Sequence, residues 1–159
     1  MFPSLESSRA LWIKGVLLSL LLLALVACSV STTTQSWMFV LTGEAKAASG
    51  QQTLLLSKHS PIFAFADKPS REHRYLDTNS FAALIKPGSK GYGDAPPNAV
   101  ITYGQSGALN RVEVVITEAK VLANGDLQLT LKSPLASGIS HRVSIFIDAF
   151  PTAVNNQIT

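Results

Sequence analysis

Short apolar runs and alternating apolar and polar positions dominate the chain from residue 37 onward. Most are four to six residues long, which is the length of a β-strand rather than of a helix. Asn124-Gly125 separates two such segments and is a strong signal for a tight hairpin, because both residues tolerate a positive φ. The predicted strands cover residues 37–42, 53–57, 62–66, 99–103, 112–117, 121–131 with its turn, and 143–147.

One short stretch has helical periodicity instead. Phe81, Leu84 and Ile85 follow the i, i+3, i+4 spacing of a single apolar stripe, and Asp77 or Thr78 is placed to cap its start. The polar segment 67–74 is predicted to be a surface loop, and residues 87–97 an irregular loop. The pattern predicts a mainly β protein: a small antiparallel β-sandwich or partly closed barrel of about seven strands with one short helix.

The N-terminal segment has the layout of an export signal. Arg9 and Lys14 precede an apolar run over residues 16–26, which ends at Leu25-Val26-Ala27-Cys28. This ending resembles the lipobox of bacterial lipoproteins. The resemblance implies that residues 1–27 are removed as a signal peptide and that Cys28, the only cysteine of the chain, carries a diacylglyceryl thioether. Lipid attachment at Cys28 would hold the protein on a membrane of the bacterial cell envelope.

The remaining chain divides into a polar tether at 28–36, a β-sandwich domain at 37–150 and a C-terminal tail at 151–159. Two other readings of the N-terminus stay open. The apolar run could remain as an uncleaved membrane helix centred on 17–31. Alternatively, cleavage after Ala48 would release a soluble protein, although it would remove the predicted strand 37–42.

Four segments, in this order, resemble a family of small exported bacterial β-rich proteins of uncharacterised function. They are Phe65-Ala66-Asp67-Lys68-Pro69-Ser70-Arg71, Asp94-Ala95-Pro96-Pro97-Asn98-Ala99, 114–131 with its Asn-Gly-Asp turn, and Ser144-Ile145-Phe146-Ile147-Asp148. The similarity spans about 37–150. It implies one exported domain and identifies no catalytic residue.

Charge and composition narrow the function further. Without residues 1–27, the chain keeps 11 Lys and Arg against 9 Asp and Glu, without a basic stripe, which disfavours nucleic acid binding. The three histidines lack zinc-type spacing, and Ser106 is not in a nucleophile elbow. We therefore expect no metal, no cofactor and no catalytic residue.

Two polar clusters are candidates for ligand binding. The first contains Asp67, Arg71 and Arg74, and the guanidinium groups of the two arginines suit an anionic ligand. The second contains Tyr92, Asp94 and Asn98, in or beside the long loop. Both clusters could equally serve only their own loops, through ion pairs and side-chain to backbone hydrogen bonds.

The sequence therefore predicts a lipid-anchored envelope protein. Its β-domain would bind or scaffold an envelope partner or a small anionic ligand. The alternatives are a single-pass membrane protein with the same exported domain, and an envelope hydrolase whose site joins the two polar clusters.

Overall fold

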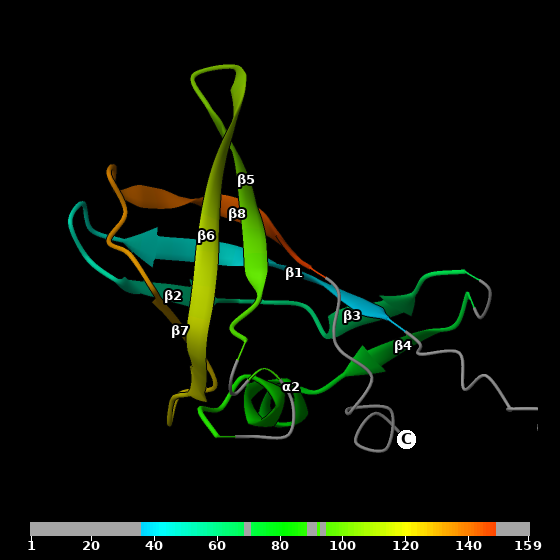
Figure 1. Cartoon of the computed structure of the whole chain (residues 1–159). Helices are drawn as coiled ribbons and strands as arrows, with labels where there is room; N and C mark the ends of the chain where they lie inside the picture. The colour runs from blue at the N-terminus through cyan, green and yellow to red at the C-terminus, as the bar shows by residue number, and fades with distance from the viewer. Residues whose placement is uncertain (1–35, 69–70, 89–91, 93–94, 149–159) are drawn as a thin grey trace, which may run out of the picture. The chain divides into compact units, whose positions relative to one another are not determined.

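The structure is a computed structural model that describes residues 36–68, 71–88, 92 and 95–148. They all fall in one compact unit, Thr34–Thr159. The unit contains eight strands and the short helix α2, arranged as in Figure 1. In chain order the elements are β1 (Trp37–Ala47), β2 (Thr53–Ser57), β3 (Ile62–Ala66), β4 (His73–Leu76), α2 (Thr78–Leu84), β5 (Asn98–Gln105), β6 (Ala108–Val121), β7 (Leu127–Leu131) and β8 (Ile139–Ile147).

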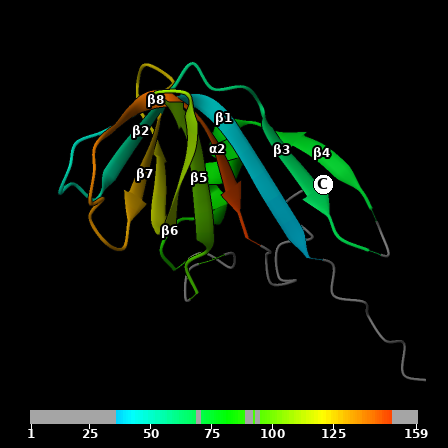
Figure 2. The same cartoon turned by 90° about the horizontal axis from the view of Figure 1, so that it is seen from above.

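The eight strands form one antiparallel sheet in the order β2-β7-β6-β5-β8-β1-β3-β4. An additional pairing between β2 and β1 joins the two ends of the first six strands, so these six close into a ring. The β3–β4 hairpin extends from the ring beyond β1. Seen from above, the strands follow one another around a curve (Figure 2). The mainly β prediction with one short helix is confirmed, with eight strands in place of about seven.

β1 makes ring closure possible because one of its edges is shared by two partners. Residues Trp37–Val40 pair with β3, and Glu44–Lys46 pair with β2, while β8 covers the opposite edge. Gly43 lies at the change of partner. A Cβ built there would lie 2.7 Å from the Ser57 carbonyl oxygen and 3.1 Å from the His59 Cα. Only glycine fits this crossing without a backbone shift.

The interior of the ring is filled by the side chains that point inward, which are every second residue along each strand. Among the described residues, every buried one is apolar or aromatic. The largest of those that are less than 2% exposed include Phe39, Phe81, Leu41, Leu54, Leu56 and Ile62. Helix α2 contributes Phe81, whose ring packs edge-on against Phe39 at 5.7 Å between centroids. The Asp77 carboxylate caps the helix by accepting hydrogen bonds from the backbone of Asn79 and Ser80. The predicted cap and apolar stripe are confirmed.

The strand boundaries differ from the predicted ones in two places. The predicted surface loop 67–74 overlaps β4, so that prediction is wrong for His73 and Arg74. β4 is the terminal strand of the sheet, and an edge strand tolerates charges that a central strand excludes. β1 also continues to Ala47 instead of ending near Thr42, because its pairing with β8 extends to Ile139.

Candidate functional site

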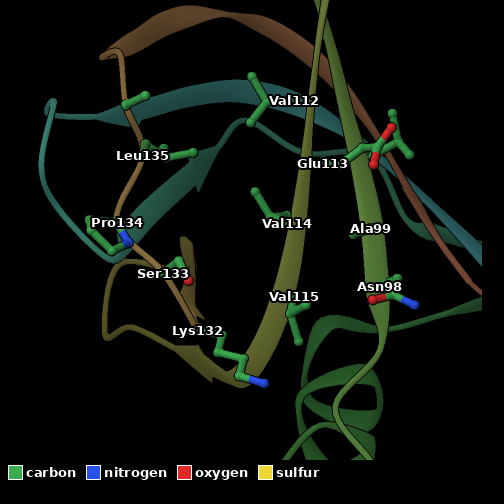
Figure 3. A pocket seen from close by; sticks show the side chains of 12 residues that line it. Asn98, Ala99, Val112, Glu113, Val114, Val115, Lys132, Ser133, Pro134 and Leu135 are labelled. Atoms are coloured by element: carbon green, nitrogen blue, oxygen red, sulfur yellow. The ribbon is translucent and has the colours of Figure 1, made fainter.

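An open cleft of about 640 Å³ lies between β6 and the segment that connects β7 to β8. Its lining is shown in Figure 3. One wall is formed by Val112–Val115 of β6, and the other by Lys132–Ala136. Asn98–Val100 of β5 complete the lining. The cleft is therefore an opening in the wall of the six-stranded ring.

The opening exists because β7 is much shorter than β6. β6 has 14 residues and β7 has 5, so β7 pairs only with Ile116–Val121. Lys132 extends this pairing by one hydrogen bond, from its N–H to the Val115 carbonyl at 2.9 Å. Pro134 then lacks a backbone donor, and Leu135 is held instead by the β1–β2 connection, through a 3.0 Å hydrogen bond to Gln51. Among the described strands, none pairs with this edge of β6 from Ala108 to Val115.

The side chains of β6 alternate between the cleft and the outer surface. Val112 and Val114 lie opposite Ile101 and Ala99 of β5, which are buried, so the two valines share the inward face. Figure 3 shows both valines directed into the cleft, and Glu113 directed to the other side, over β5. Both valines are only half-buried. The cleft thus combines an apolar floor with the unpaired backbone edge of a strand, which suits non-covalent binding.

The first predicted cluster organises its own turn. The Asp67 carboxylate accepts a hydrogen bond from the Lys68 N–H at 2.6 Å, and the Arg71 N–H donates to the Asp67 carbonyl at 3.3 Å. The Arg74 guanidinium carbon lies 5.4 Å from the centre of the Trp37 ring, and its Nη2 lies 3.4 Å from Glu72 Oε2. Asp67 and Arg74 therefore have roles within the fold, and Arg71 is exposed.

The second cluster is divided between the core and the cleft. Tyr92 is 4% exposed, and its hydroxyl donates to the Asp148 carbonyl at 2.6 Å. Burial, and then the negative charge of Asp148, raise the pKa of the Tyr92 hydroxyl far above its usual range. The backbone carbonyl of Asn98 accepts a hydrogen bond from the Asp148 N–H at 2.9 Å, and Asn98 also lines the cleft. Asp94 and Cys28 lie outside the described residues.

Among the described residues of the two clusters, Asp67 and Asn98 lie at the same end of the sheet but on different strands. Asp67 follows β3 and Asn98 begins β5, but β1 and β8 lie between these strands. Three strand spacings correspond to about 14 Å along the sheet. The hydrolase alternative requires the segments 67–74 and 92–98 to meet. Residues 69–70 and 93–94 lie outside the described residues, so this alternative stays a prediction. Asn98 is the predicted site residue that lies in the cleft.

The histidines are dispersed. His59 Nε2 lies 3.1 Å from the Gly125 carbonyl, His73 lies against Phe63, and His141 stacks on Tyr103 with 5.4 Å between ring centroids. Within the part of the chain that the structure describes, no group of three or more His, Cys, Asp or Glu residues is arranged to hold a metal ion.

A second surface, here called the aromatic face, covers the outside of the β3–β4 hairpin. It consists of Phe63, Phe65, His73 and Tyr75. Phe63 is in ring contact with Phe65 at 5.8 Å and with Tyr75 at 5.4 Å, and Tyr75 is 71% exposed. A smaller groove of about 270 Å³ adjoins this face at Phe65 and continues to Phe146.

Of the twelve residues that line the cleft, eleven were not predicted as site residues, among them Val112, Glu113, Val114 and Lys132. The alternation of β6 was visible in the sequence and indicated a strand with one face in water. The signal that was missed is the unequal length of the two strands joined at Asn124-Gly125. A strand that is longer than its hairpin partner leaves part of its edge unpaired.

Comparison with protein-family models, with curated proteins and with solved structures finds no match to this chain. The resemblance to exported bacterial proteins therefore stays a prediction. Among the described residues, there is no helix with the length and apolar character needed to cross a membrane.

Proposed function

We propose that this protein is a lipid-anchored binding module of the bacterial cell envelope, and that the cleft beside β6 is its binding site. The observation that carries the proposal is the opening in the ring. There, half-buried valines and the unpaired edge of β6 lie together on the surface. Groups of this kind hold a partner by apolar contact and backbone hydrogen bonds.

The anchor is the second part of the proposal. Cys28 ends the apolar run 16–26, and 28–36 are mostly Ser, Thr and Gln. A diacylglyceryl group on Cys28 would place acyl chains in the bilayer, where each buried CH₂ contributes about 0.8 kcal/mol. The polar segment would hold the ring and its cleft away from the membrane surface.

Acyl labelling of the full-length chain tests the anchor. We expect Cys28→Ser to abolish incorporation of labelled palmitate and to move the protein out of the membrane fraction, because the thioether cannot form on serine. Ser29→Ala is the matched control and keeps both label and membrane association. Continued labelling of the Cys28→Ser protein would contradict lipidation at Cys28. Membrane retention without label, together with an intact mass that includes residues 1–27, would instead support the single-pass alternative.

A further inference from the structure

We propose that the cleft binds an extended segment of another protein, which adds to β6 as an antiparallel strand in line with β7. This inference rests on the proposed function and names the class of partner. The bound segment contains four residues in the order apolar, basic, apolar, acidic, counted from its N-terminus. In the same order, these residues lie opposite Val114, Glu113, Val112 and Arg111.

The direction of the backbone groups follows from one hydrogen bond. The Val115 carbonyl points toward the cleft side, where it accepts from the Lys132 N–H. Backbone groups of a strand alternate between its two edges, so those of Glu113 and Arg111 point to the same side as those of Val115. The groups of Val112 and Val114 face β5, where they pair with Ile101 and Ala99. An added strand would therefore form hydrogen bonds with the backbone N–H and C=O groups of Arg111 and Glu113.

The apolar floor of the cleft determines which inward-facing residues the partner segment should carry. Val112 and Val114 are half-buried, and Leu135 on the opposite wall is 3% exposed. Side chains directly opposite each other in an antiparallel pair share one face of the sheet. The partner residues opposite the two valines therefore point inward, and apolar side chains there would complete the core at the opening.

The charges on the outer face of β6 determine which outward-facing residues the partner segment should carry. Arg111 and Glu113 are both exposed and share the outer face of β6. Opposite charges that face each other across two strands are stabilising, whereas like charges are destabilising. A basic residue opposite Glu113 and an acidic residue opposite Arg111 therefore fix both the register and the direction of the partner.

A second copy of the chain fits this edge less well than a separate segment. A two-fold pairing of β6 with itself that places Arg111 opposite Glu113 also places Leu109 opposite Val115. That position is already filled by Lys132. Shifting the pairing toward the tip of the β5–β6 hairpin removes the overlap with Lys132. This shift sets Arg111 opposite Leu109, so Arg111 and Glu113 no longer face each other. A segment whose first paired residue lies opposite Val114 meets neither difficulty.

Binding of two short labelled peptides to the purified full-length chain tests the inference by fluorescence anisotropy. The first peptide contains Val-Lys-Val-Glu, and the second contains Val-Glu-Val-Lys. Two cross-strand charge pairs change from attractive to repulsive between them, so we expect the first to bind about three- to tenfold more tightly. The double variant Arg111→Glu with Glu113→Arg should reverse this preference. Both side chains are exposed, so the variant should unfold like the wild type.

Backbone methylation gives a matched control within the peptide. N-methylation of Lys or Glu blocks an N–H that faces β6 and should abolish binding, whereas N-methylation of the second Val blocks an N–H that faces away and should leave binding unchanged. Equal affinity of the two peptides, or equal effects of methylation at all positions, would overturn strand addition. A dimer of the free chain that is lost in Arg111→Glu would overturn it in favour of self-pairing. Cys28 is intact throughout, so these outcomes are separate from failure of the anchor.

Discussion

At the scale of single residues, Tyr92 connects the segment between α2 and β5 to the end of β8. Its ring is buried, and its hydroxyl reaches the Asp148 carbonyl at 2.6 Å. The sequence alone makes Tyr92 a candidate ligand-binding residue, because it lies in a long loop rich in Gly and Pro. The contact with Asp148, which is 56 residues away, depends on the fold and leaves no local pattern.

We expect Tyr92→Phe to lower the free energy of unfolding by about 1 kcal/mol, the usual contribution of one intramolecular hydrogen bond. The pKa of Tyr92 is raised in the folded state, mainly by burial, so folding favours the neutral hydroxyl. This stabilisation is complete below the unfolded pKa of about 10 and is lost as the pH rises above it.

Urea unfolding at about pH 8 and about pH 11, on either side of the tyrosine reference value, measures this effect. The wild type should lose more stability between the two conditions than the Tyr92→Phe protein does. Tyr75→Phe, at a 71% exposed position, serves as the control. An identical pH dependence for wild type and Tyr92→Phe would refute the assigned role.

At the scale of elements, the change of partner along β1 determines whether the ring closes. Gly43 lies where the β2–β3 connection crosses β1, with the Ser57 carbonyl oxygen 2.7 Å from the place of a Cβ. A methyl group there would force the two backbone segments apart. Because Glu44–Lys46 pair with β2 immediately afterward, such a shift would act directly on the pairing that closes the ring.

We therefore expect Gly43→Ala to destabilise the protein by about 1–3 kcal/mol, as overpacking in a tight site does. Gly104→Ala is the matched control, since Gly104 lies in β5 and a Cβ there would meet nothing within 4 Å. Chemical denaturation of both variants measures the difference. Equal stability of the two variants would show that the crossing adapts without strain.

Elements were predictable from sequence where local pattern and final packing agree. The predicted strands 53–57 and 62–66 have the same bounds as β2 and β3 in the structure. The helix was predicted together with its N-cap and its apolar stripe. The second half of β1, Gly-Glu-Ala-Lys-Ala, has little strand propensity and becomes a strand through its pairing with β8. The first two residues of β4, His73 and Arg74, belong to the predicted loop 67–74, although Arg74 packs over Trp37.

At the scale of the whole molecule, the described part is a six-stranded ring with a gap in its wall. The apolar alternation could predict a β-sandwich or barrel. It could not predict the gap, because this depends on the long-range β1–β2 pairing and on the point where Pro134 and Leu135 leave β6. The candidate site was therefore predicted only through Asn98, while its valines were assigned to an ordinary strand.

The unpaired edge of β6 is the proposed site at which this protein binds its partner. Residue-resolved amide hydrogen exchange tests this proposal most directly, by comparing the full-length protein in native membrane vesicles with the purified protein in detergent micelles. We expect slower exchange in vesicles at Arg111 and Glu113, whose N–H groups face the cleft. Val112 should be unchanged, because its N–H faces β5. Equal exchange at Arg111 and Glu113 in both samples, or protection confined to the aromatic face, would contradict partner binding at this edge of β6.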